Sequence, residues 1–214
     1  MCYSSRVIKL LLATDNPGKQ REYRQLLAPL SDMKLCTPAE LGLSIAVRED
    51  GATYAENARS KALAYTQASG LPTLADDSGL EVDVLGGEPG MRSARYAGSD
   101  ASDADRYHLL LQRLRGVPWE KRSARFRCVI ALTTPAGQIF TTEGTCEGMI
   151  AFEPEGEHGF GYDPIFYVPE YGQTIAQLPA EIKNRISHRA RAVQAMLPIL
   201  THLLADENPV PGAS

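Results

Sequence analysis

Apolar and polar positions along the chain form short apolar runs and longer stretches with helical spacing. Strand-like apolar runs cover residues 7–13, 33–36, 73–75, 80–85, 126–134, 138–150 and 165–168. Helical spacing, together with capping residues, predicts helices at residues 19–30, 53–69, 102–114 and 188–204. The runs at 126–134 and 138–150 are separated by Pro135, Ala136 and Gly137, which predicts a long β-hairpin.

The order of these elements predicts the fold class and the domain organisation. Strands and helices alternate, and an antiparallel hairpin is inserted among them, so we expect an α/β protein with a mixed sheet. No internal repeat or long linker interrupts the sequence, and we expect one domain over residues 1–206. Residues 207–214 (ENPVPGAS) are expected to form a flexible C-terminal tail.

Composition and charge exclude several classes of protein. The 214 residues are 43% hydrophobic and 22% charged, which is enough for a buried core. The net charge of -4 offers no field for wrapping duplex nucleic acid, so we expect no nucleic-acid partner. No apolar run approaches the roughly 20 residues of a membrane span or the length of a signal peptide, so we expect no membrane association. The four cysteines lack metal-site spacing, which predicts free thiols in a reducing cytoplasm.

The loop after the first predicted strand has the features of a phosphate site. Gly18 allows close approach of the backbone, and Lys19 stands at the start of a predicted helix, where backbone N–H groups and the dipole favour an anion. The segment has one glycine and is not the Walker-type loop, so an ordinary strand–helix turn is the alternative interpretation.

A second candidate segment is ADDSG, which contains Asp76, Asp77 and Ser78. Adjacent carboxylates after a short apolar strand are unfavourable if they are buried without a partner, and Mg²⁺ would neutralise them. One carboxylate would then hold the metal while the other accepts a proton from water. The alternative interpretation is a simple Asx-type turn in a hairpin.

Two further segments contain aromatic and basic residues. In GFGYD, Phe160 and Tyr162 lie between and beside glycines and are candidates for stacking on a base, or else for core packing. In KNRISHRAR, Ser187 is a predicted N-cap, which places His188 and Arg189 in the first helical turn. Cations there oppose the helix dipole, which favours a role in binding an acceptor such as the carbonyl of a 6-keto purine.

Six motifs in order form a more specific pattern than any one of them. They are ATDNPGKxxE, EDGxTYxENAxxKA, ADDSGLEVDxLGGxPGxxSARYAG, FRCVIAL, GFGYDPIF and KNRISHR. Together they resemble the noncanonical purine nucleoside triphosphate pyrophosphatases, also called inosine triphosphatases or dITP/XTP pyrophosphatases. The resemblance covers residues 7–203.

The resemblance implies an activity and a fold. The activity is Mg²⁺-dependent hydrolysis of ITP, dITP or XTP to the monophosphate and pyrophosphate, which keeps these bases out of DNA and RNA. The fold is an elongated central mixed sheet flanked by helices, with two lobes and the active-site cleft between them, commonly as a homodimer.

The resemblance also implies roles for particular residues. The implied catalytic residues are Asp77, Asp76, Lys19 and Lys61, and the implied metal ligands are Glu49 and Asp77. The implied substrate-binding residues are Thr14, Asp15, Asn16, Pro17, Gly18, Lys19, Ser78, Phe160, Gly161, Tyr162, Asp163, Lys183, His188 and Arg189.

The sequence departs from the family pattern at three places. Ala190 replaces a frequent glycine after SHR, Gln177 stands where an acid is frequent, and the tail after Ala205 has no counterpart. Other functions stay open from the residues alone. These are a pyrophosphatase for pyrimidine nucleotides, a nucleotide-sensing module without turnover, and a single-stranded nucleic-acid binder, the last disfavoured by the net charge.

Overall fold

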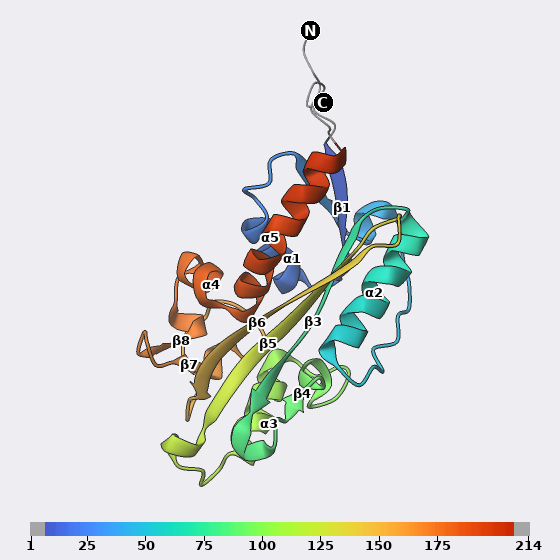
Figure 1. Cartoon of the computed structure of the whole chain (residues 1–214). Helices are drawn as coiled ribbons and strands as arrows, with labels where there is room; N and C mark the ends of the chain where they lie inside the picture. The colour runs from blue at the N-terminus through green and yellow to red at the C-terminus, as the bar shows by residue number, and fades with distance from the viewer. Residues whose placement is uncertain (1–6, 208–214) are drawn as a thin grey trace. The chain divides into compact units, whose positions relative to one another are not determined.

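The computed structural model describes residues 7–207, and these residues build one mixed sheet with flanking helices (Figure 1). The sheet order is β2-β1-β3-β5-β6-β7-β8, and β4 pairs with β3. The strands are β1 (Ile8–Leu12), β2 (Met33–Cys36), β3 (Thr73–Val82), β4 (Pro89–Gly90), β5 (Ser123–Thr133), β6 (Ile139–Ile150), β7 (Phe166–Val168) and β8 (Gln173–Thr174). The helices are α1 (Pro17–Leu26), α2 (Tyr54–Ser69), α3 (Asp103–Arg113), α4 (Ala180–Ile186) and α5 (His188–Glu207). The α/β fold class predicted from the sequence is confirmed.

The chain divides into two compact units. The first takes its described residues from Met1–Asp77, Val129–Thr142 and Ala192–Ser214, and the second comprises Ser78–Cys128 and Glu143–Arg191. The predicted tail lies outside the described residues, except for Glu207 at the end of α5. None of the helices within residues 7–207 has the length and apolar character of a membrane span.

The first unit contains a parallel arrangement around β1. Strand β1 pairs in parallel with β2 on one side, where Ile8 lies opposite Met33, and with β3 on the other, where Leu12 lies opposite Leu74. Helix α1 connects β1 to β2, and the chain then returns through α2 to β3 on the other side of β1 (Figure 1). The inner strand is buried at residues 10–13, as the apolar run predicts.

The second unit has its own hydrophobic core. Its members come from β3, α3, β5, β6, β7 and the turns that follow, and they include fully buried Leu80, Ile150 and Phe166. Strand β7 pairs antiparallel with β6 and with β8. This core supports the loops that carry the aromatic and basic residues of the second unit.

Local sequence signals set the ends of several helices. Thr53 caps α2 by accepting the Glu56 N–H, and Gly70 ends that helix in the left-handed conformation. Ser102 caps α3 in a reciprocal capping box with Asp105. The predicted bounds of α2 and α3 are therefore close to the observed ones.

The structure corrects the predicted elements in several places, and one helix was missed. Residues 76–79 are not a turn between two strands, because β3 runs through them as one strand of ten residues. Helix α1 ends at Leu26 instead of residue 30, because the chain turns near Pro29. Helix α4 was not predicted, because seven residues between Pro179 and Ser187 offer too short a pattern.

Candidate active site

The first group of predicted residues lies where β1 ends in the first unit. The loop of residues 14–16 leaves the carboxyl end of β1, and Asp76 and Asp77 follow the β3 residue paired with that end. Since β2 and β3 flank β1 on opposite sides, this is a topological switch point of a parallel sheet. In open α/β sheets, ligands bind beyond the carboxyl ends of the strands at such points.

The first loop is held in shape by its own polar groups. Asn16 caps α1, since its Oδ1 accepts the Lys19 N–H at 3.0 Å, and Pro17 occupies the first helical position. The Gln20 side chain donates to the Thr14 carbonyl at 2.8 Å. Asp15, Asn16 and Pro17 are exposed, so the amino end of α1 can be reached by an anion.

Lysines from two helices compensate the carboxylates. Lys19 Nζ lies 3.0 Å from Asp76 Oδ2, and the Asp76 side chain is almost completely buried. Lys61 Nζ forms an ion pair with Glu49 Oε1 and donates to the Asp76 carbonyl at 3.3 Å. Burial alone would lower the pKa of Lys61, but the charge of Asp76 and the hydrogen bond to Glu49 outweigh it and raise that pKa. Lys61 is therefore charged in a largely buried setting, and together with Lys19 beside Asp76 it suits contact with phosphate.

Asp77 differs from its neighbour Asp76 in its hydrogen-bond partner. Asn57 Nδ2 donates to Asp77 Oδ2 at 2.8 Å, and Asn57 Oδ1 in turn accepts the Gly51 N–H at 2.8 Å. Burial raises the pKa of Asp77, the hydrogen bond from Asn57 lowers it, and the charge of Glu49 raises it further, so that the pKa is raised overall. A carboxylate with a raised pKa is a suitable proton acceptor.

Asn57 was not predicted as a site residue. It lies in the ENA part of the α2 motif, and its side chain connects the segment after Glu49 to Asp77. The only signal in the sequence was an amide on the buried face of a helix, which has no defined role until the partner strand is known. Gly51 is required beside it, because a Cβ there would overlap Asn57 Oδ1.

The residues present fit a Mg²⁺ ion. Glu49 and Asp77 are close enough for their charges to interact, and both offer carboxylate oxygens. Within residues 7–207 no group of three or more His, Cys, Asp or Glu side chains is arranged as a metal cage. Mg²⁺ usually binds one or two carboxylates together with water and substrate phosphates, so two acids suffice.

The second group of predicted residues lies in the second unit. Lys183 Nζ forms a buried ion pair with Asp163 Oδ2, and that same carboxylate oxygen accepts the Phe160 N–H at 2.9 Å. Lys183 Nζ and Arg189 Cζ lie 5.0 Å and 5.6 Å from the centre of the Phe160 ring. Arg189 Nη2 also donates to Ser78 Oγ at 3.3 Å. The structure thus brings five predicted residues into one aromatic–cation cluster.

Two further predicted residues of this group, Tyr162 and His188, contact the hydrophobic core. The Tyr162 hydroxyl donates to the Ser93 carbonyl at 2.8 Å, and the ring is buried in the hydrophobic core of the unit. The buried His188 ring stacks on Phe126 with a centroid distance of 4.7 Å. Phe160 is only partly buried, so the geometry favours Phe160 over Tyr162 for stacking on a base.

Two of the three departures from the family pattern, Ala190 and Gln177, have local explanations. Ser187 Oγ accepts the Ala190 N–H at 3.1 Å, which is the predicted N-cap, and Ala190 itself is fully buried. Gln177 Oε1 accepts the Thr174 N–H at 2.8 Å, and its Nε2 donates to Glu155 Oε2 at 2.9 Å. A carboxylate at residue 177 could not donate to Glu155, so glutamine suits this position.

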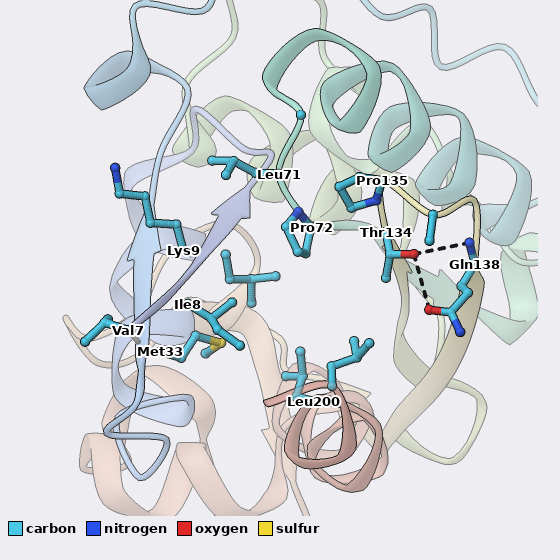
Figure 2. A pocket seen from close by; sticks show the side chains of 14 residues that line it. Val7, Ile8, Lys9, Met33, Leu71, Pro72, Thr134, Pro135, Gln138 and Leu200 are labelled. Atoms are coloured by element: carbon cyan, nitrogen blue, oxygen red, sulfur yellow. Dashed lines mark hydrogen bonds between the residues drawn. The ribbon is translucent and has the colours of Figure 1, made fainter. Parts of the chain in front are cut away.

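The first unit also contains a pocket that none of the predicted site residues lines (Figure 2). Its volume is about 620 Å³, and Ile8, Met33, Leu71 and Leu200 are among its mostly apolar lining residues. Thr134 Oγ1 on its wall accepts the Gln138 N–H at 3.2 Å. This pocket has no carboxylate, and it is therefore not the candidate active site.

Fold and site together define a class of protein. In the first unit, the carboxylate–lysine cluster beside an exposed helix start suits a phosphate group, and in the second unit the aromatic–cation cluster suits a planar ring. The sequence model of the Ham1 family matches residues 10–199, and the chain belongs to this family. The resemblance found from the six motifs is thereby confirmed.

Relatives of known name and structure agree with this assignment. The chain is 52% identical to the dITP/XTP pyrophosphatase of Desulforamulus reducens over 196 residues, which is 92% of this chain and 97% of that protein. It is 46% identical to the dITP/XTP pyrophosphatase of Bacillus subtilis over 89% of this chain and 96% of that protein. The Ham1 protein structure from Coxiella burnetii matches with a TM-score of 0.82 and 42% identity, covering 91% of this chain and 99% of that one. The Ham1 protein of Staphylococcus aureus matches with a TM-score of 0.81 and 40% identity, over 91% and 99% of the two chains.

Proposed function

We propose that this protein is a Mg²⁺-dependent pyrophosphatase that hydrolyses dITP, XTP and ITP to the monophosphate and pyrophosphate. The observation that carries the proposal is the cluster of Asp76, Asp77, Lys19 and Lys61 beside the amino end of α1. The dITP/XTP pyrophosphatases at about half identity over nearly the whole chain support the same substrate class.

The phosphates are assigned to the first unit. Lys19, Lys61 and the backbone N–H groups at the start of α1 bind the triphosphate and stabilise the charge that develops on the leaving pyrophosphate. Glu49 and Asp77 hold Mg²⁺, which when bound neutralises phosphate charge. In the structure Lys19 is paired with Asp76, and Lys61 with Glu49. When substrate and metal bind, these lysines would contact phosphate oxygens instead, and carboxylates would contact the metal.

The hydrolytic step uses Asp77 as proton acceptor. Water attacks the α phosphorus, the bond from that phosphorus to the bridging oxygen breaks, and pyrophosphate leaves with the bonding electrons. The proton of the attacking water passes to Asp77. Asp76 is engaged by Lys19, whereas Asp77 is held by the neutral Asn57 amide, so we assign the proton to Asp77.

The base is assigned to the second unit. Phe160 stacks on the purine, while donors from Lys183, His188 and Arg189 face its 6-keto oxygen and the sugar. Adenine offers an amino group at that edge, so buried donors facing it would lose their acceptor, which disfavours ATP. Removal of these nucleotides would keep their bases out of DNA and RNA. We further propose that the enzyme works as a homodimer, as the resemblance implies, and in the cytoplasm, as its free thiols predict.

A panel of triphosphates tests the proposal directly. ITP, dITP, XTP, GTP, ATP and dUTP are each incubated with enzyme, with and without Mg²⁺, and both pyrophosphate and orthophosphate are measured. We expect pyrophosphate from ITP, dITP and XTP, with Mg²⁺ only, and at least tenfold slower release from ATP and dUTP. Preferred cleavage of dUTP, release of orthophosphate, or binding without turnover would each overturn the assignment.

A further inference from the structure

The loop Gly159–Asp163 in the second unit is held by carboxylates at two successive backbone amides. The Phe160 N–H donates to Asp163 Oδ2 at 2.9 Å, within the loop itself. The next amide, that of Gly161, donates to Asp103 Oδ2 at 2.7 Å, although Asp103 lies 58 positions earlier in the chain. The loop that carries Phe160 is thus attached to helix α3.

Asp103 is well placed to keep this contact. It is the first residue of α3, where a negative charge is favourable, and its Oδ1 accepts from Arg106 Nη1 at 2.6 Å. One carboxylate oxygen is therefore fixed by Arg106 while the other holds the Gly161 N–H. Hydrogen bonds to a charged acceptor are shorter and stronger than neutral ones, which agrees with the short distance.

The conformation of the loop explains why an outside anchor is needed. Gly161 has φ +65°, in the left-handed region that favours glycine. A Cβ at Gly159 would overlap the Asp163 carboxylate, so this position also depends on the absence of a side chain. Two glycines give the loop its shape but leave its backbone intrinsically flexible, and the carboxylates restrict it.

We propose that Asp103 is a positioning residue for base recognition, because its carboxylate holds the Gly161 amide and so fixes the Phe160 ring, against which the base-reading Lys183 and Arg189 also lie. The inference rests on the proposed function. Asp103 itself touches no reacting atom, and the groups assigned to hydrolysis belong to the first unit. Its loss should therefore change KM and base selection and leave kcat largely unchanged.

Two acids in the first turn of α3 provide a matched pair of variants. Asp103 holds the loop, whereas Asp105 closes the capping box with Ser102, whose N–H it accepts at 2.9 Å. Both Asp103→Ala and Asp105→Ala remove a favourable charge from the same helix start, so both lower helix stability. Only the first removes the contact to Gly161.

The experiment compares steady-state kinetics with dITP and dATP for the wild type and both variants. For Asp103→Ala we expect about a tenfold higher KM for dITP and a similar fall in the ratio of kcat/KM for dITP over dATP, the size expected for one hydrogen bond to a charged acceptor. We expect kcat to change less than twofold, and inhibition by inorganic triphosphate, which has no base, to be unchanged. Asp105→Ala should keep the wild-type dITP/dATP ratio of kcat/KM despite a lower unfolding temperature. Asp103→Asn retains an acceptor oxygen and should therefore keep most of the wild-type ratio.

Hydrogen exchange supplies a direct readout of the contact. The Gly161 amide should exchange faster in Asp103→Ala than in the wild type, and at the wild-type rate in Asp105→Ala. If Asp103→Ala yields too little folded protein, Asp103→Ser serves the same purpose, because serine suits a helix start but is too short to reach Gly161. A wild-type enzyme that does not discriminate dITP from dATP would refute the proposed function. The role of Asp103 would be refuted if the wild type discriminates but its dITP/dATP ratio of kcat/KM is unchanged in Asp103→Ala. It would also be refuted if Asp105→Ala lowers that ratio equally.

Discussion

The two units of the protein contain candidate site residues of different chemical kinds, and these make different kinds of contact. In the first unit the candidate residues are charges that compensate one another, such as Lys19 with Asp76 and Lys61 with Glu49. In the second unit they are a ring and hydrogen-bond donors, with Phe160 near Lys183 and Arg189. Charges suit a polyanion and a metal, while a ring with donors suits the edge and face of a base.

The two groups are also positioned by different structural elements. In the first unit, the acidic pair lies on β3, Lys19 on α1 and Lys61 on α2, while Glu49 lies in the segment before α2. In the second unit, Phe160 lies on a loop whose amides donate to the carboxylates of Asp163, within the loop, and of Asp103, on α3. Changes in the first unit should therefore affect the rate of the chemical step, and changes in the second should affect which nucleotide is selected.

Asp77→Asn should give the largest effect and test the role of the first unit. Asparagine retains an oxygen that can accept from Asn57, so the fold should persist, but it cannot accept the proton from water. We expect kcat for dITP to fall about 10²- to 10⁴-fold, as for loss of a general base. Pyrophosphate release measures the rate. As a control, Asp83→Asn removes another acid, one that pairs with Arg125, and should retain activity. Near-normal turnover in Asp77→Asn would show that Asp77 is not the proton acceptor.

Arg189→Met should produce the second largest effect. It should change the preference for ITP over ATP and not the rate of the chemical step. Methionine fills much of the space of this buried side chain but offers no donor to Ser78 or to a base. We expect the ratio of kcat/KM for ITP over ATP to fall about tenfold to a hundredfold, because discrimination depends on unsatisfied donors. Arg191→Met is the matched control, since Arg191 lies two positions further along α5 and donates to the Thr145 carbonyl. An unchanged ratio in Arg189→Met would contradict a base-reading role for this residue.

Phe160→Leu and Tyr162→Phe should separate the two aromatic residues of one loop. Loss of stacking at Phe160 should raise KM for dITP roughly tenfold with little change in unfolding temperature, since one stacking contact is worth about 1–3 kcal/mol. Tyr162→Phe removes the buried hydrogen bond to the Ser93 carbonyl and should lower stability by about 1 kcal/mol with KM nearly unchanged. Steady-state kinetics and thermal unfolding of both variants check this. The reverse pattern would mean that Tyr162, and not Phe160, contacts the base.

Local patterns in the sequence predicted much of the fold. Helix α2 was predicted almost to the residue because Thr53 and Gly70 are strong start and stop signals. By contrast, the two strands predicted at residues 73–75 and 80–85 belong to one strand, β3, in which the adjacent buried acids Asp76 and Asp77 need partners. Lys19 and Asn57, from distant parts of the chain, supply those partners and allow β3 to continue.

The candidate site could be predicted where its chemical groups lie in consecutive residues of one motif. The first loop, the acidic pair and the SHR segment contain their chemistry in consecutive residues. Asn57 and Asp103 were missed because each acts through one long-range contact, with Asp77 and with the Gly161 amide respectively. Nothing in the residues around either position indicates that partner, so only the folded chain reveals it.

Buried thiols offer a final and smaller test, which compares the cores of the two units. Burial raises the pKa of Cys146, in the second unit, to about 11 from its ordinary value of 9.0. The unfolded thiol therefore ionises before the folded one, so its contribution to stability is complete below pH 9 and is lost as the pH rises toward 11. The difference in unfolding free energy between wild type and Cys146→Ala should shrink by about 1 kcal/mol between pH 7.5 and pH 10, as measured by urea unfolding. Burial also raises the pKa of Cys36 in the first unit, so Cys36→Ala should show a loss of the same sign. If the difference in unfolding free energy between wild type and Cys146→Ala stays constant over this pH range, the thiol is accessible to water. The core of the second unit would then be less tightly packed than the burial of Cys146 implies.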